Sequence, residues 1–366
     1  MLRLTNAICT VFPTSFFILM SCYNICNMIK TNLPIDCVLA VTYRCNSRCT
    51  MCDIWKLKDT PELELDYYKK LPPTLGDINV SGGEPFLRQD IVELVKILHK
   101  TCPKAKIVIS TNGYLTDLIK EKVREILKTV PNLGVGVSID GLDEMHDKIR
   151  GIPGGFNLAT KTVKVLREEL GMKNLRLAFT VSKQNVEHLS KVYDLSRELG
   201  VQFTMALAQS SEFFFGGKQV QESPDVNILK EQFNYVIRQE LRGWQPKRWA
   251  RAYFTKSLLD FAITGKQALP SRAGTDFFFL DPFGNVYPSV VHNAVMGNLH
   301  DKNFREIWDS SEAGAAREKV REAKQDVWMI CTARTAIKNH PVRVGWWIIN
   351  NKLKAQMSNV KTTAQS

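Results

Sequence analysis

The strongest constraint on the fold is a regular alternation of short apolar segments and amphipathic segments over residues 36–215. Runs rich in β-branched residues predict strands at 36–42, 77–81, 106–110, 133–139, 175–181 and 201–206. Segments with a helical period lie between them, at 91–100, 117–127, 159–170 and 186–199. This order predicts an α/β fold, a partial (β/α)6 TIM-like barrel whose parallel strands are joined by right-handed crossovers.

Three cysteines follow the first predicted strand within one polar loop. Cys45, Cys49 and Cys52 have the spacing C-x3-C-x2-C, whereas the other six cysteines have apolar neighbours and are predicted to be buried. An odd number of clustered thiols does not indicate disulfides and favours a soft metal in a reducing compartment. Three thiolates can bind three irons of a cubane cluster and leave the fourth iron open. Zinc, the alternative, needs a fourth ligand. His146 is the one nearby histidine with polar neighbours in the sequence, and no second pair of ligand residues occurs.

Residues 43–53, YRCNSRCTMCD, resemble the cluster loop of the radical S-adenosylmethionine (SAM) superfamily. Further family elements occur in the expected order at the ends of predicted strands, where barrel enzymes place their active sites. These elements are SGGEP at 81–85, STNG at 110–113 and SIDG at 138–141, followed by Arg150.

The resemblance implies a site in which Cys45, Cys49 and Cys52 bind one 4Fe-4S cluster. It implies that Glu84 contacts the amino group of SAM, and that Ser138 and Arg150 hold its carboxylate and ribose. Met51 replaces the family's usual aromatic before the third cysteine, and a thioether can make a comparable contact. The cofactor contacts expected by this match are Met51, Gly82, Gly83, Glu84, Pro85, Thr111, Asn112, Ser138, Asp140 and Arg150.

A helical connector, 216–265, and a small α+β module, 266–345, are expected after the barrel. The connector is predicted to be helical over 219–256, and the module contains a hairpin at 277–288 and a helix at 304–324. Residues 277–308 resemble the Twitch/SPASM modules of radical enzymes, in which cysteines bind an auxiliary cluster.

The corresponding positions here are Ser271, Ser289, Ala323 and Val327, and Cys331 is the one cysteine beyond residue 102. One thiol cannot hold a cubane, so no auxiliary cluster is expected. The module is expected to close the barrel mouth and contact substrate.

The net charge of +12 is concentrated in the C-terminal half. Residues 242–256 carry five basic and no acidic side chains, and residues 331–366 carry six and none. We expect Arg248 and Arg251 to face an anionic substrate; the alternative is an amphipathic helix whose aromatic residues are core. The basic tail, 346–366, predicts either peripheral membrane contact or a helix docked on its own domain. Nucleic acid is not an expected partner.

Residues 1–35 contain 26 consecutive uncharged positions between Arg3 and Lys30. This segment predicts a weak membrane anchor, or a true start at Met28; a secretory signal is the least favoured reading because a thiol-bound cluster needs the cytosol. The expected location is cytoplasmic, with membrane association through this segment.

The function expected from the resemblance is reductive cleavage of SAM to methionine and a 5'-deoxyadenosyl radical. The radical then abstracts hydrogen from an unidentified anionic substrate, and a flavodoxin or ferredoxin supplies the electron. Two alternatives stand beside it: a radical SAM enzyme that modifies peptides, and a non-catalytic metal-binding or interaction protein on the same scaffold.

Overall fold

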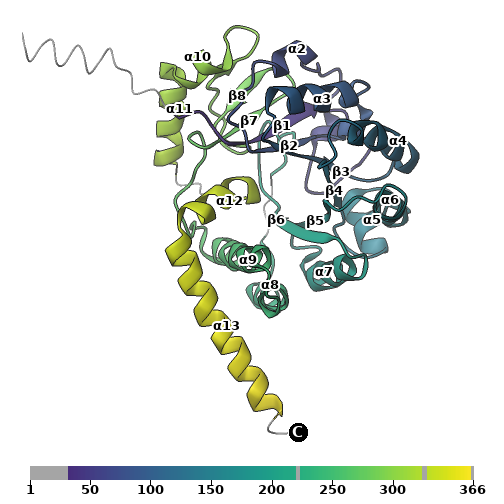
Figure 1. The fold of residues 1–366 in the computed structure, drawn as a ribbon, viewed down its shortest axis with the longest axis vertical. Helices are drawn as coiled ribbons and strands as arrows, with labels where there is room; N and C mark the ends of the chain where they lie inside the picture. Colours follow the sequence, from purple (N-terminus) through teal and green to yellow (C-terminus); the bar gives the residue numbers. More distant parts are fainter. Residues whose placement is uncertain (1–31, 220–222, 324–327, 364–366) are drawn as a thin grey trace, which may run out of the picture. The chain divides into compact units, whose positions relative to one another are not determined.

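The computed structural model describes residues 32–219, 223–323 and 328–363, with side chains in the last helix described through residue 352 (Figure 1). The chain divides into two compact units, Met1–Asn32 and Leu33–Ser366. The predicted anchor, alternative start and secretory signal fall in the first unit, outside the described residues. The rest of the description concerns the second unit.

The described strands form one nine-stranded sheet in the order β6-β5-β4-β3-β2-β1-β7-β8-β9. The strands are β1 (Asp36–Thr42), β2 (Asp77–Gly82), β3 (Lys106–Thr111), β4 (Gly134–Ser138), β5 (Leu175–Val181), β6 (Gln202–Leu207), β7 (Phe277–Leu280), β8 (Asn285–Tyr287) and β9 (Gly297–Asn298). Every pairing from β6 to β7 is parallel, and the two pairings beyond β7 are antiparallel. The six predicted barrel strands are confirmed, two of them at both ends and the others with ends displaced by one residue.

Strand β1 is buried along its whole length because both of its faces are covered. Its alternate residues face two different apolar cores. Cys37, Leu39 and Val41 join the main core, while Val38 and Ala40 join a second core with residues of β7.

Amphipathic helices connect successive barrel strands. Figure 1 shows α3, α4, α6 and α7 beside the strands that they connect. The helices of this half are α2 (Leu65–Tyr68), α3 (Ile91–Thr101), α4 (Thr116–Leu127), α5 (Glu144–Arg150), α6 (Gly155–Glu168) and α7 (Leu189–Glu198). In α3 the buried side chains are those that the helical period predicts, Ile91, Val92, Leu94, Val95 and Leu98.

The C-terminal part contains more helices than the sequence pattern predicts. They are α8 (Val226–Arg242), α9 (Pro246–Thr264), α10 (Phe304–Trp308), α11 (Ser311–Glu322), α12 (Ile330–Asn339) and α13 (Pro341–Thr363). The segment predicted to be helical over 219–256 forms two helices, because α8 ends at Gly243 and Pro246 begins a new helix, where its missing N–H costs nothing. The segment predicted to be helical over 304–324 also forms two helices, since Ser310 caps a second helix start.

The C-terminal hairpin continues the barrel sheet instead of forming a separate layer. Strand β7 pairs in parallel with β1 over four residues, from Asp36 with Phe277 to Leu39 with Leu280. Helix α12 contacts β1 and α9, and α9 contacts β6. Residues of the predicted module therefore pack at the β1 edge of the six-stranded partial barrel, and α9 of the connector packs at the β6 edge.

Among the described residues, no helix combines the length and the hydropathy that a membrane span requires.

Candidate active site

The three-cysteine loop leaves β1 and is held by two other loops at the same end of the sheet. Backbone N–H groups of Arg48 and Thr50 donate to the carbonyls of Arg150 and Ile149, at 2.9 and 2.8 Å. The N–H of Asp53 donates to the carbonyl of Phe215 at 2.9 Å. The end of α5 and the segment after β6 thus fix both halves of the cysteine loop.

The cysteines of this loop are half-buried, and burial disfavours the charged thiolates of two of them. Burial is the main cause that raises the pKa of Cys45 to about 12 and that of Cys52 to about 11. The Cys49 sulfur lies 3.2 Å from Ser47 Oγ and accepts from Arg150 Nη1 at 3.7 Å. Bound cationic iron would offset the cost of three buried thiolates, so the donor set fits an iron–sulfur cluster.

The zinc alternative has no ligand set in the described part of the chain. No three His, Cys, Asp or Glu side chains there converge on one metal-ion position. His146 is fully buried, and its Nδ1 accepts from the Asp140 N–H at 3.2 Å, which leaves the proton on Nε2, 3.1 Å from the Tyr114 hydroxyl. Burial lowers the pKa of His146 to about 3, so this histidine is a neutral structural link.

Glu84 joins the loops that follow β2 and β3. Its carboxylate accepts from Thr111 Oγ1 and the Asn112 N–H, both at 2.8 Å, and from the Phe86 N–H at 3.2 Å. Burial raises its pKa to about 7, against these hydrogen bonds. Pro85 follows as the first residue of a 3-10 turn. A carboxylate so buried and so fixed in direction suits a cationic ligand group.

Gly82 and Gly83 allow one loop to lie against another. A Cβ at Gly82 would overlap the Thr42 carbonyl oxygen, and one at Gly83 would overlap that of Arg44. In their place, the Gly83 N–H donates to Thr42 and the Glu84 N–H to Arg44, each at 2.8 Å. The resemblance placed Gly82 and Gly83 among the cofactor contacts. In the structure, the closest neighbours of these two glycines are backbone atoms of residues 42–44.

Asp140 and Arg150 form a buried ion pair next to the cysteines. Arg150 Nη2 lies 2.5 Å from Asp140 Oδ2, and Asp140 Oδ1 accepts from the Thr180 N–H at 2.6 Å. Burial raises the pKa of Asp140, and the Arg150 guanidinium opposes that shift. Ser138 ends β4 two residues earlier and is half-buried. Arg150 therefore links a buried carboxylate to the thiol of Cys49.

Sequence reasoning missed several residues that shape the site. Asn112 Nδ2 donates to Asn46 Oδ1 at 2.6 Å, which connects the β3 loop to the cysteine loop. Asn185 donates to the Asp140 carbonyl at 2.9 Å. Asn46 lies between two of the cysteines, and this position is the one sequence signal that could have identified it. Asn185 is 45 residues from Asp140, and no sequence signal points to it. Met51 is half-buried next to Cys52.

Four aromatic side chains, Phe213, Phe214, Phe279 and Tyr287, lie next to the cysteines, and we call them the aromatic wall. Phe279 and Tyr287 belong to the C-terminal module. Phe213 stacks on Tyr287 with ring centroids 4.3 Å apart, and Phe279 contacts Phe213 and Phe214. These residues share one apolar cluster with Cys45, Cys52 and Cys331. The module therefore closes the barrel next to the cysteine loop with apolar side chains.

The positions that correspond to auxiliary-cluster ligands are occupied by ordinary packing and capping contacts. Ser289 Oγ lies 2.7 Å from His292 Nδ1 and accepts from the N–H of Val291. Ser271 Oγ accepts from the Ala273 N–H, and Ala323 ends α11. Val327 lies outside the described residues. Cys331 is buried, and burial raises its pKa to about 12.

The basic stretch 242–256 differs from our expectation of an anion-facing surface. Glu240, which is buried, lies 3.3 Å from Arg248 Nε and 3.1 Å from Arg251 Nη2. The anion that these two arginines contact is thus a carboxylate of the chain itself, at the junction of α8 and α9.

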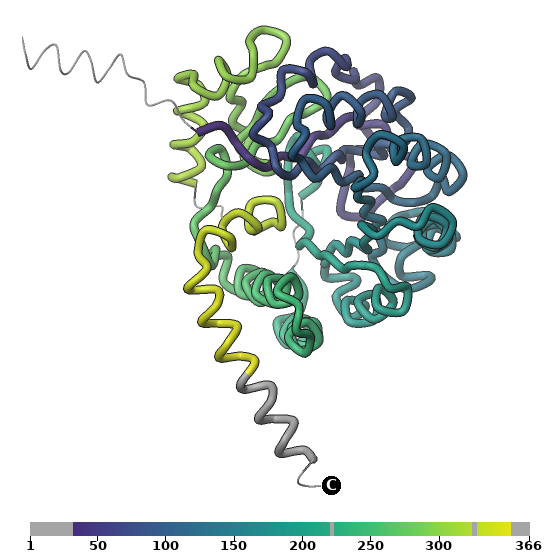
Figure 2. Tube along the Cα trace, in the orientation of Figure 1, coloured from purple at the N-terminus to yellow at the C-terminus, as the bar shows by residue number. Residues whose placement is uncertain are grey.

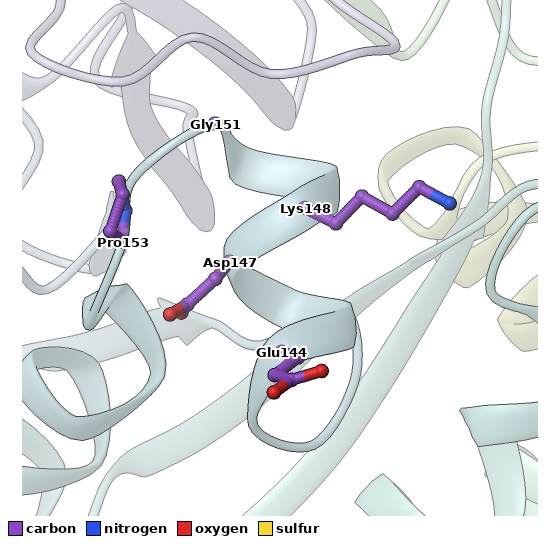
Figure 3. A pocket seen from close by; sticks show the side chains of 5 residues that line it. All are labelled: Glu144, Asp147, Lys148, Gly151 and Pro153. Atoms are coloured by element: carbon purple, nitrogen blue, oxygen red, sulfur yellow. The ribbon is translucent and has the colours of Figure 1, made fainter.

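A cavity of about 420 Å³ lies on α5 and is lined by Glu144, Asp147, Lys148, Gly151 and Pro153 (Figure 3). Asp147 accepts from the N–H groups of Gly154 and Phe156 at the start of α6. Figure 3 shows Lys148 on the opposite side of the helix from Pro153. None of the predicted cofactor contacts lines this cavity.

The fold and the interlocked cysteine loop define an iron–sulfur enzyme built on a partial barrel. Residues 39–195 match the radical SAM superfamily, and residues 272–333 match SPASM, described as an iron-sulfur cluster-binding domain. The chain therefore contains a radical SAM domain, and it is an enzyme. This domain implies a 4Fe-4S cluster and SAM, and the enzyme assignment removes the non-catalytic alternative.

Several curated proteins are similar to this chain, two of those described here over about three quarters of its length and one over less than half. An AdoMet-dependent heme synthase from Methanosarcina barkeri strain Fusaro is 28% identical over 77% of this chain and 84% of that protein. An Fe-coproporphyrin III synthase from the same organism is 38% identical over 43% of this chain and 40% of its own length. The mycofactocin maturase MftC of Mycolicibacterium smegmatis is 27% identical over 76% of this chain and 71% of that protein.

Among solved structures, Streptococcus suis SuiB bound to S-adenosylmethionine has a TM-score of 0.61 at 18% identity, covering 84% of this chain and 74% of SuiB. This likeness confirms the fold class of a partial barrel with a small C-terminal module.

The SPASM match conflicts with the expectation of no auxiliary cluster, since the matched domain is one that binds additional iron–sulfur clusters. Residues 272–333 of this chain contain one cysteine, Cys331.

Proposed function

We propose that Cys45, Cys49 and Cys52 hold the 4Fe-4S cluster, and that the loops after β2, β3 and β4 hold SAM beside it. When bound, the cluster and SAM supply a 5'-deoxyadenosyl radical that removes hydrogen from a substrate. The observation that carries the proposal is the interlocking of the cysteine loop with the Glu84 and Arg150 networks at one end of the sheet.

The chain's own residues position and shield the reacting groups. Glu84 offers a buried acceptor for an ammonium, and its hydrogen bonds to Thr111 and Asn112 fix its direction. Arg150, held by Asp140, places a positive charge 3.7 Å from the Cys49 sulfur and donates to it. The aromatic wall excludes water from the side of the loop that carries Cys45 and Cys52.

We further propose a single cluster per chain. A cubane needs three or four thiolates, and the SPASM-like region supplies Cys331 alone. The positions of the missing ligands, Ser271 and Ser289, make local hydrogen bonds that stabilise their turns without metal.

For the substrate we propose an apolar, flat molecule that carries carboxylates. Phe213 and Phe214 of the aromatic wall are half-buried beside the cysteines, and their rings suit a planar apolar partner. Arg48, exposed in the cysteine loop, donates to the carbonyls of Cys45 and Ser47 and lies 4.9 Å over the Trp55 ring. Its charge can therefore meet an anionic group at the site, the role that we had expected of Arg248 and Arg251.

Among the products named for similar proteins, an iron porphyrin fits these surroundings best. A peptide is the second candidate, supported by the similarity to the maturase MftC and to SuiB, which has also been solved bound to the precursor peptide SuiA. A flavodoxin or ferredoxin is the proposed electron donor, and the proposed location is the cytoplasm.

The initiation chemistry is tested by anaerobic reconstitution with iron and sulfide, followed by measurement of 5'-deoxyadenosine formed from SAM and dithionite. We expect about four irons per chain, as one cubane requires. Cys49→Ala is expected to lose the cluster and at least about a thousandfold of the cleavage rate, which corresponds to about 4 kcal/mol. A cluster-loaded wild-type protein that forms no 5'-deoxyadenosine would contradict the proposal.

The substrate class is tested separately by adding iron coproporphyrin III and following its Soret band. We expect a saturable shift that weakens about tenfold in Arg48→Gln, the loss of roughly one charge-assisted contact. An unshifted band would exclude the porphyrin and favour a peptide substrate.

A further inference from the structure

Helix α13 has a packed side that docks on the chain itself. The rings of Trp347 and Tyr253 meet edge to face at 5.4 Å. Lys352 Nζ lies 4.0 Å from the ring of Trp244 and 4.2 Å from that of Trp249. Figure 2 shows α13 beside α9, which it contacts together with α8 and α12. The predicted docking of the tail on its own domain is therefore correct for this side.

The other side of α13 carries large apolar side chains that nothing in the described chain covers. Val342 is 84% exposed, Trp346 69% and Ile349 57%. Their spacing of four and three residues places them in one stripe along the helix. Leu353 continues the same periodicity in the sequence. We call Val342, Trp346 and Ile349 the α13 stripe.

Basic residues accompany the α13 stripe, and acidic residues are absent from the sequence around it. Residues 331–366 contain six Lys and Arg and no Asp or Glu. Arg343 is one residue after Val342, which places it about 100° around the helix from the stripe. Lys354 and Lys361 follow Arg343 by 11 and 18 residues in the sequence, intervals of about three and five helical turns. The helix therefore combines an apolar stripe with a positively charged flank.

The nature of the covering partner follows from this combination. Arg334 and Lys338 of α12 pair with Asp36 and Asp77, so they do not contribute to this choice. A protein partner would bury the stripe equally well, but residues 341–366 carry four Lys and Arg and no Asp or Glu, and so favour a surface that is negative throughout. Tryptophan and basic side chains are enriched at the headgroup level of bilayers, and anionic lipids attract such flanks. No described helix spans a membrane, so the contact is with the surface.

We propose that α13 docks the chain on an anionic lipid bilayer, with the α13 stripe among the headgroups and the Arg343 flank against the negative charge of the lipids. This inference is independent of the proposed catalytic function, and it assigns membrane contact to the C-terminal helix.

The test is co-sedimentation of the full chain with vesicles of phosphatidylcholine alone or with about 30% phosphatidylglycerol. Wild type is expected to bind the anionic vesicles at least about tenfold more tightly, with weaker binding at high salt. The double variant Trp346→Asp, Ile349→Asp is expected to lose about a hundredfold or more of this partitioning. Leu158→Asp, which adds a charge at an exposed apolar position on α6, is the matched control and should bind like wild type.

Three outcomes would overturn the proposal. The first is that the double variant binds the vesicles as wild type does, while removal of residues 1–31 abolishes the binding. The second is no binding of wild type to either vesicle. The third is a dimer in sedimentation experiments without lipid that the double variant dissociates, which would identify a second copy as the partner. Quenching of tryptophan fluorescence by brominated lipids, reduced in Trp346→Phe, is the supporting readout at the residue level.

Discussion

Strands β1 and β7 are neighbours in one sheet, but the segments that follow them have opposite chemistry. The loop after β1 carries three thiols and is surrounded by buried polar groups such as Glu84 and Asp140. The hairpin that follows β7 places Phe279 and Tyr287 in an apolar cluster and carries no cysteine.

This difference shows that the first region is stabilised by polar contacts and the second by apolar packing. Polar groups at the β1 end hydrogen-bond to one another across several loops. At the β7 end, aromatic side chains pack against one another. A region held by apolar packing can keep its fold without a metal, whereas a loop of half-buried thiols gains from binding one.

The largest expected loss of stability in this comparison follows from removal of a buried aromatic ring on the β7 side. Phe279→Ala removes a fully buried ring that contacts Phe213, Phe214 and Tyr287, and it should lower the free energy of unfolding by about 4 kcal/mol. Urea unfolding followed by circular dichroism measures this loss. Phe283→Ala, at the exposed turn of the same hairpin, should cost less than about 1 kcal/mol. Equal losses would mean that the interior is not close-packed.

A smaller loss of stability is expected at the β1 end from a single methyl group. Gly83→Ala forces a Cβ into the Arg44 carbonyl, which we expect to cost about 3 kcal/mol and to weaken iron retention by displacing the cysteine loop. The matched control is Gly314→Ala in α11, where the new Cβ meets nothing within 4 Å. That control should stabilise the protein by about 0.5–1 kcal/mol. A tolerated Gly83→Ala would contradict the interlocking of the two loops.

The pH dependence of stability should distinguish the polar end from the apolar end. Burial raises the pKa of Glu84 from 4.5 to about 7, so its contribution is fully present below pH 4.5 and is lost as the pH rises to 7. The loss amounts to at most about 3 kcal/mol over that window. Glu84→Gln should flatten this part of the stability curve in urea titrations at successive pH values. Identical slopes in the two proteins would show that Glu84 is ionised throughout.

The smallest effect is expected for the last cysteine. Cys331→Ala should cost about 1 kcal/mol, because it trims one buried atom from the apolar cluster, and it should leave the iron content unchanged. Iron analysis of this variant beside Cys49→Ala makes the comparison direct. A loss of iron in Cys331→Ala, or about eight irons in wild type, would establish an auxiliary cluster and overturn the single-cluster proposal.

Residues that are close in sequence were predicted well, and residues that meet only in space were not. The spacing of Cys45, Cys49 and Cys52 and the Gly-Gly-Glu sequence identified the candidate site because local motifs keep their residues together. The expectation for Arg248 and Arg251 differed from the structure because their partner, Glu240, belongs to the preceding helix, and a composition count cannot show that a buried carboxylate neutralises them.

The sequence by itself determined the alternation of strands and helices, the three-thiol loop and the scarcity of cysteines in the last third. Periodicity and spacing are local properties, so they survive without coordinates. Only the tertiary structure decided that β7 extends the barrel sheet beside β1, that Gly82 and Gly83 are required by the cysteine loop, and that one side of α13 is packed while the other is bare. These outcomes depend on which segments, distant in the sequence, bury apolar surface against one another. Packing of that kind cannot be read from any short stretch of sequence.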